Sequence, residues 1–323
     1  MAIRSDPTKD VEDSNTPELD PAELVHEARK AIKRMRALAR LLRDELGEQE
    51  FRRVNGSLRA AGQRLAGARD AEVRLATLHS LLERHPKALA REGIRRLQER
   101  LAAEREQAIE PSGHEQAIEP SDRKQAIEPS DRKQAIGPSD HEQAIEPSDR
   151  KQAIEPSNHE QVLVDIAEMR AQLARWNLAD HNFSTLAPGL ERIYREGRRR
   201  AKRVKRRGAR DAQDLHDWRK RVKSLYYALD MLGAKKTKAR GPARRANRLG
   251  ELLGEDHDLW MLSLYVEEHR DAFAGEAAGE RELLRRIERR RKRLRKRALK
   301  IGRRLYRHKP ASFTRRIGRS LPG

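Results

Sequence analysis

The chain contains no cysteine among its 323 residues. A disulfide framework, a thiolate metal site and a cysteine nucleophile are therefore excluded. Aromatic side chains are also scarce, at 4% of the residues, which leaves few rings on which nucleic-acid bases could stack. No stretch approaches the roughly 18 apolar residues that span a bilayer, and residues 1–19 are polar and acidic rather than signal-like. We therefore expect a soluble, non-secreted protein with no membrane partner.

Strand signals are missing as well. Strict alternation of apolar and polar residues is hard to find, whereas helical periodicity dominates residues 21–106 and 162–308. We therefore expect the folded part to be all-α. The segments that the periodicity and the glycine and proline positions predict as helices include 20–46, 48–65, one helix from Pro86 onward, 185–207, 211–232, 243–253, 256–270 and 277–307.

Positive charge is what the chain has in excess. It carries 72 Lys and Arg against 51 Asp and Glu, which gives a net charge of +21 at pH 7 and a pI near 10.6. Such a field attracts polyanions over long distances, but it says nothing about the fold. The net charge alone is compatible with three kinds of partner: nucleic acid, inorganic polyphosphate and an anionic membrane surface.

One helical segment, Val25–Lys33, occurs again as Leu215–Lys223. At about 100° per residue, the charged side chains of each copy share one face, and apolar residues such as Ile32 and Trp218 lie on the other. The charged faces consist of His26, Arg29, Lys30 and Lys33 in the first copy and His216, Arg219, Lys220 and Lys223 in the second. The duplication favours a repeated anion-binding surface over the plainer alternative, a solvated charged face beside a satisfied histidine.

Two further landmarks recur in the same order. Asp70 is matched by Asp258 after 188 residues, close to the 190 that separate the two histidines, and Tyr194-Arg195 recurs as Tyr306-Arg307. The chain is therefore predicted to consist of two similar, unequal halves. The predicted organisation is a disordered tail at 1–19, a first helical half at 20–208 and a second half at 209–323.

A low-complexity insertion interrupts the first half. The hexapeptide Gln-Ala-Ile-Glu-Pro-Ser, or its glycine variant, recurs with a period of nine residues across 107–160. A proline in every repeat breaks a continuous helix, and one isoleucine per repeat buries too little apolar area to offset the ordering entropy. We expect a disordered insertion; a β-solenoid is the alternative, although the glycine-aspartate pattern of its calcium-binding kind is missing.

Taken together, four segments resemble the CHAD family, the conserved histidine α-helical domain. They are Val25–Lys30, Leu65–Val73, Trp176–Arg199 and Leu215–Lys220. The resemblance covers roughly residues 20 to 320 apart from the insertion. Two positions depart from the family pattern: Glu72 stands where an aspartate is common, and Tyr226 where an arginine is common.

The resemblance implies two four-helix bundles related by pseudo-two-fold symmetry, whose facing basic helices form a central groove that binds inorganic polyphosphate without hydrolysing it. Arginines near the end of the first half and their counterparts in the second then become further groove residues, with a simple basic patch as the alternative. The predicted polyphosphate-binding set therefore consists of the two charged faces and six further arginines: Arg36, Arg195, Arg198, Arg199, Arg304 and Arg307.

Signals for catalysis or a metal are weak. The sequence has no glycine-rich phosphate loop, no Gly-x-Ser-x-Gly elbow and no paired carboxylates among the cations to hold Mg²⁺. Asp70 and Asp258, the latter beside Asp256 and His257, are better explained by helix N-capping or internal ion pairs than by metal ligation. We expect no enzyme activity, no cofactor and no metal.

The leading hypothesis is therefore non-catalytic polyphosphate binding. Sequence-nonspecific binding of RNA or DNA is the alternative, and assembly of other proteins through the insertion and the 277–307 helix is a third class. We expect a cytoplasmic location, with polyphosphate granules as one site within it and the nucleus as another if the organism is eukaryotic.

Overall fold

The computed structural model describes residues 21–64, 67–109, 182–233 and 237–321, together with residues 164, 168, 171 and 176. The predicted tail at 1–19 and nearly all of the 107–160 insertion lie outside the described residues. Within the described part there is no strand, so the all-α prediction is confirmed.

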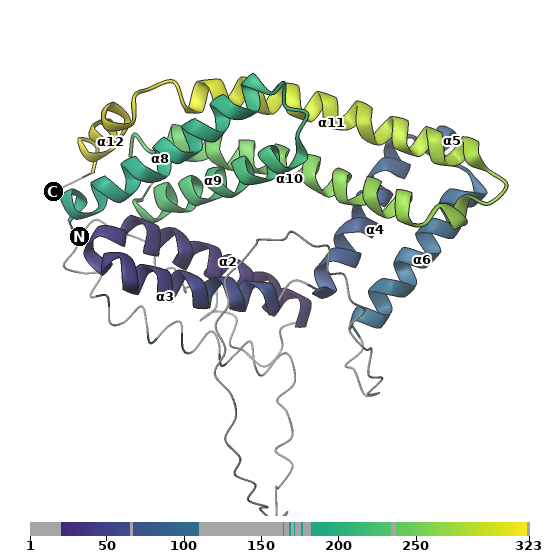
Figure 1. The fold of residues 1–323 in the computed structure, drawn as a ribbon, viewed down its shortest axis with the longest axis horizontal. Helices are drawn as coiled ribbons and strands as arrows, with labels where there is room; N and C mark the ends of the chain where they lie inside the picture. The colour runs from purple at the N-terminus through teal and green to yellow at the C-terminus, as the bar shows by residue number, and fades with distance from the viewer. Residues whose placement is uncertain are drawn as a thin grey trace, which may run out of the picture.

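The described chain folds into a bundle of helices (Figure 1). In order they are α2 (Pro21–Leu41), α3 (Arg43–Arg64), α4 (Gly67–Arg84), α5 (Pro86–Leu89), α6 (Glu92–Ile109), α8 (Phe183–Arg206), α9 (Ala212–Met231), α10 (Arg240–Glu268), the 3-10 helix η3 (Arg270–Phe273), α11 (Ala277–Leu305) and α12 (Pro310–Gly318).

Helix α9 lies at the centre of one part of the bundle and contacts α2, α8 and α10. Helices α10 and α11 pack along each other, and α4 and α6 pack against them. Helix α11 runs along one long edge of the molecule, whereas α2 and α3 lie on the opposite side (Figure 1). The two helices that carry the duplicated histidine segment, α2 and α9, are therefore neighbours.

Several helix boundaries follow from local chemistry and lie close to the predicted bounds. The Asn182 side chain accepts a hydrogen bond from the Thr185 N–H at 3.2 Å, and Asp211 accepts one from the Asp214 N–H at 3.0 Å. Both are N-caps that satisfy backbone donors of the first helical turn. Helix α8 ends just before Gly208, whose φ of 70° is the left-handed conformation that glycine adopts without strain.

Two predicted boundaries in the first half are wrong. The first helix ends at Leu41 rather than Leu46. The predicted break at Gly47 is present, with φ at 72°, but it is a kink inside α3. The single helix predicted from Pro86 is divided into α5 and α6. The Glu276 carboxylate accepts a hydrogen bond from the Gly93 N–H at 2.6 Å, so a residue 183 positions away caps the start of α6.

Two predictions in the second half need correction as well. The break expected between 253 and 256 does not exist, because α10 continues through Gly254. A Cβ atom at Gly254 would lie 3.5 Å from Nε of Arg219, so this glycine lies under a side chain of α9 and does not end the helix. Asp258 consequently lies in mid-helix and cannot be an N-cap.

Helix α12 was not predicted. It packs against α8, where Phe313 stacks on Tyr194 with ring centroids 3.9 Å apart. The Tyr194 hydroxyl donates to the carbonyl oxygen of Leu305 at 3.1 Å, and its ring lies 5.2 Å from that of Tyr306. The two tyrosines of the internal duplication therefore meet in the core and join α8 to the end of α11.

Candidate anion-binding surface

The central feature of the candidate site is a set of cations where α2 packs against α9. Lys30 and Arg34 of α2 lie close enough to Tyr226 and Tyr227 of α9 for their charges to lower the pKa of both phenols, against the larger raising effect of burial. Lys30 also forms an ion pair with Glu27 at 3.0 Å. The structure thus brings the cationic side of α2 to α9. The backbone of His26 belongs to α2, but its side chain lies outside the described residues.

The charged side of α9 lies across α10 in a regular antiparallel register. The His216 and His257 rings are 4.5 Å apart between centroids. One turn further along α9, Arg219 lies over Gly254, and a further turn along, Cε of Lys223 would be 3.0 Å from a Cβ at Gly250. The contacting residues are spaced three and four apart on α9 and, in the opposite direction, three and four apart on α10. The two glycines of α10 leave room there for the side chains of Arg219 and Lys223.

Further cations crowd together where the C-terminal part of α2 lies near Arg221, in the middle of α9. The Arg36 guanidinium donates to the Asn55 side chain at 3.2 Å, and Arg40 donates to the backbone oxygen of Arg36 at 2.9 Å. Burial, followed by the charges of Arg36 and Arg221, lowers the pKa of Arg40 to about 10. Burial, then Arg59 and Arg221, likewise lowers the pKa of Arg36.

The same electrostatic pattern continues along α9. Burial lowers the pKa of Lys223, and Arg219 lowers it further. Burial lowers the pKa of His216, with added contributions from Lys220 and Arg219. Each group is therefore partly desolvated and repelled by like charge, and an anion placed here would relieve both effects. We name the set Lys30, Arg34, Arg36, Arg40, His216, Arg219, Lys220 and Lys223 the α2–α9 surface.

Of the remaining predicted residues on these helices, Arg29 is half-buried and Lys33 is exposed. Lys220 is exposed, and it forms no ion pair with a described carboxylate. These positions agree with a charged surface open to solvent on one side of α2 and α9. The contacts that bring the two helices together are confirmed; ligand binding at these residues stays a prediction.

The predicted anion-binding cations on α8 do not form one row, because they have different partners in the structure. On the side of α8 that faces α9, three ion pairs join the helices: Glu196 to Arg221 at 2.8 Å, Arg200 to Asp217 at 3.2 Å and Arg203 to Asp214 at 2.6 Å. Arg195 pairs with Glu191 of its own helix. Arg198 donates from Nε to the Tyr306 carbonyl at 3.2 Å, at the end of α11, while Arg199 is exposed.

Arg304 and Arg307 lie elsewhere. Both are exposed at the C-terminal end of α11, and Arg307 donates to Nε2 of His308 at 2.9 Å. The structure therefore does not join them to the α2–α9 surface. Instead, they belong to the outer side of α11, which is described below.

Sequence reasoning missed three members of this neighbourhood. Arg34 and Arg40 continue the cationic side of α2, with Arg40 one turn beyond Arg36. His257 corresponds to Arg69 in the internal duplication, since both precede the matched aspartates Asp258 and Asp70. That correspondence was the available signal for a residue facing His216.

The acidic residues near His257 are structural where the structure describes them. Asp256 is buried and pairs with Arg295 at 2.9 Å and with Arg291 at 3.4 Å. Asp258 also has an interaction partner, while the Asp70 side chain lies outside the described residues. Across the described ranges, no three His, Asp or Glu side chains are grouped as metal ligands.

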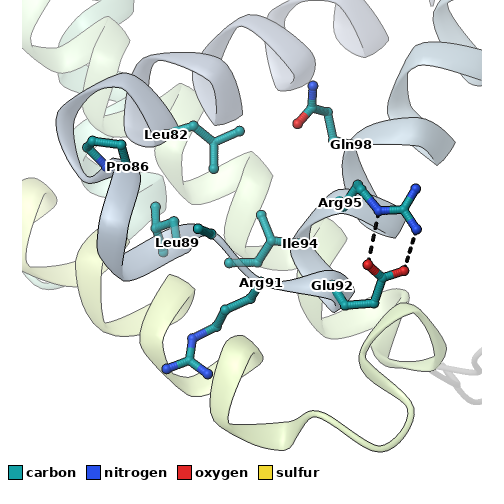
Figure 2. Close-up of a pocket in the computed structure, with 9 residues that line it drawn as sticks. Leu82, Pro86, Leu89, Arg91, Glu92, Ile94, Arg95 and Gln98 are labelled. Atoms are coloured by element: carbon teal, nitrogen blue, oxygen red, sulfur yellow. Dashed lines mark hydrogen bonds and ion pairs between the residues drawn. The ribbon is translucent and has the colours of Figure 1, made fainter.

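A pocket of about 480 Å³ lies away from these cations, at the end of α4 and around α5 and α6. Figure 2 shows Leu82, Leu89 and Ile94 on its apolar side, and Glu92 paired with Arg95 at its rim. It contains none of the predicted anion-binding residues, so it is not part of the candidate site.

A family model for the CHAD domain matches residues 12–267. The chain belongs to the CHAD domain family. The matched range includes α2 to α9 and nearly all of α10, whereas α11 and α12 lie beyond it. No curated protein matches this CHAD chain. In the part of the chain that the structure describes, no helix combines the length and apolarity needed to cross a membrane.

The burial of His257 beside His216 makes the stability of this CHAD protein depend on pH. Burial first, then His216, Arg219 and Lys220, lower the pKa of His257 from 6.5 to about 4. Because the native state resists protonation, stability is lost as the pH falls from about 6.5 towards 4, by on the order of 2–3 kcal/mol. We expect His257→Gln to remove that part of the loss, measured by urea unfolding at pH 7.5 and pH 4.5. An equally steep loss in the variant would contradict this assignment.

Proposed function

We propose that the protein binds inorganic polyphosphate on the α2–α9 surface and does not cleave it. The observation that carries the proposal is the crowding of partly buried cations along α2 and α9. After burial, Arg36 and Arg221 lower the pKa of Arg40, and Arg219 lowers the pKa of Lys223. Proteins rarely bury like charges without a compensating anion. Family membership agrees with this choice of ligand, since the sequence resemblance implied the same one.

The geometry suits a slender chain with a charge on every unit. Residues three and four apart on a helix lie about 5–6 Å apart, so Arg219, Lys220 and Lys223 can contact successive phosphates of one chain. Arginine offers a planar fork for bidentate phosphate contact, and lysine acts as a point charge. Half-buried cations between helices are accessible to a narrow polymer more readily than to a wide one.

Single-stranded nucleic acid is the alternative at this surface, and its recognition normally uses exposed rings for base stacking. No aromatic side chain in the described residues is exposed. Tyr227 is buried, and Tyr226 is half-buried with Nζ of Lys223 5.8 Å from its ring centroid. This arrangement favours polyphosphate over single strands. On this proposal the protein is cytoplasmic and collects where polyphosphate collects.

Competition at one near-physiological salt concentration tests the proposal. Labelled long-chain polyphosphate is bound to the full chain and displaced with unlabelled polyphosphate, duplex DNA or RNA at equal phosphate concentration. We expect polyphosphate to displace the label at the lowest concentration, and the chain length of the recovered polymer to be unchanged on a gel. A preference for nucleic acid per phosphate, or shortened polyphosphate, would overturn the proposal.

A further inference from the structure

Helix α11 carries a second set of cations that the proposed function does not use. The sequence has no acidic residue from Arg289 to Arg307. Nine cations in this stretch are exposed. The eight from Arg289 to Arg304 lie within α11 and recur at spacings of three and four residues, so they share one face over about 22 Å. We name this set the α11 stripe: Arg289, Lys292, Arg293, Lys296, Arg297, Lys300, Arg303, Arg304 and Arg307.

The stripe differs from the other cations of α11 in having no carboxylate partners. Arg290 pairs with Glu255, while Arg291 and Arg295 both pair with Asp256. In contrast, none of the nine stripe residues forms an ion pair with any carboxylate that the structure describes. The fold therefore neutralises the inward arginines of this helix and leaves the outward ones unpaired.

The stripe lies on the other side of the bundle from the open side of α9. The Trp218 ring packs over Gly302 of α11, where a Cβ atom would come within 2.5 Å of it. Lys220 follows Trp218 by two residues, which is about 200° around the helix, so it points away from α11. Figure 1 agrees, with α11 along one edge and α2 on the opposite side.

Repulsion within the stripe indicates a partner of opposite charge. Like charges at i,i+3 and i,i+4 destabilise a helix, and here such pairs repeat along most of the stripe. A polyanion that neutralises them releases its own counterions and relieves this repulsion. The basic face of α11 is therefore suited to a polyanion.

The composition of the stripe selects the kind of polyanion. The apolar residues of this part of α11 lie against the core: Leu294 and Leu305 are buried, and Leu299 and Ile301 are partly buried. No large apolar side chain is therefore exposed here to enter a bilayer. Among the described residues, no aromatic ring is exposed for stacking on single-stranded bases. A row of exposed cations along one side of a long helix suits a rigid, wide partner whose phosphates lie on its outside, as in a nucleic-acid duplex.

We propose that the α11 stripe binds the phosphate backbone of double-stranded nucleic acid without reading bases, at a site separate from the α2–α9 surface. The protein then holds a duplex on one side and polyphosphate on the other. This inference does not depend on the proposed function, because it rests on different residues.

The test measures duplex DNA affinity against salt concentration for the triple variant Lys292→Gln, Lys296→Gln and Lys300→Gln. Loss of three phosphate contacts should reduce the slope of log K against log salt by about 2.7, and the affinity at ~0.15 M salt by on the order of 100-fold. The control is Arg84→Gln, Lys87→Gln and Arg105→Gln, three exposed cations on α4, α5 and α6, which lose the same charge.

We expect the control to change the slope by less than about 1, and the stripe variant to keep its polyphosphate affinity within about twofold. An unchanged slope in the stripe variant, a slope equal to that of the control, or a loss confined to polyphosphate would overturn the inference. Helical circular dichroism checks that both variants fold. Failure of the proposed function shows separately, as unchanged polyphosphate binding after substitutions on α9.

Discussion

Replacing Arg219, Lys220 and Lys223 with glutamine is expected to lower the affinity for long-chain polyphosphate at ~0.15 M salt by on the order of 100-fold, with a salt slope smaller by about 2 to 3. The three side chains lie on the open and α10-facing sides of α9, where burial and neighbouring cations already lower the pKa of Lys223. The variant therefore loses three of the cations that would contact the anion, while the remaining members of the α2–α9 surface stay in place. Fluorescence anisotropy of labelled polyphosphate across a salt series measures the loss.

Two matched variants make this result specific. The triple glutamine variants of the α11 stripe and of Arg84, Lys87 and Arg105 lose the same charge at other places, and each should keep most of its polyphosphate affinity. Stability of the α9 variant should hold, since glutamine fills similar space and relieves repulsion between partly buried cations. Equal losses in all three variants would show that only net charge matters, and the α2–α9 surface would lose its special role.

Gly189→Ala is expected to destabilise the protein by about 3 kcal/mol, or about 10 °C in melting temperature. In an open helix this substitution would be favourable by about 1 kcal/mol. Here a Cβ atom would lie 2.1 Å from the carbonyl oxygen of Leu41. That atom is backbone at the end of α2, so it cannot rotate away, and α8 must move off α2.

Gly56→Ala is the matched control. Gly56 lies inside α3 with no atom within 4 Å of the Cβ position, so alanine should stabilise the protein by up to about 1 kcal/mol. Thermal unfolding followed by circular dichroism measures both variants. A Gly189 variant as stable as the parent would mean that α2 and α8 do not approach as closely as the structure shows.

Much of the fold could be predicted from the sequence, because its causes are local. The helical period, the Asp211 cap and the glycine after α8 each act within a few residues, and the corresponding helices are found close to the predicted bounds. The boundaries that failed depend on distant contacts. Glu276 caps α6 across 183 residues, and Gly254 lies inside α10, where Arg219 of another helix packs over it.

For the candidate site, the sequence by itself determined that two helices carry a histidine and three cations on one face, because helical geometry converts spacing into a shared side. Only the tertiary structure decided which cations meet. It placed α2 beside α9, added Arg40 and His257 to the neighbourhood, and put Arg304 and Arg307 on the outside of α11. The spacing of residues along a helix determines on which side of that helix each side chain lies. Which other helix packs against that side depends on the packing of the whole core.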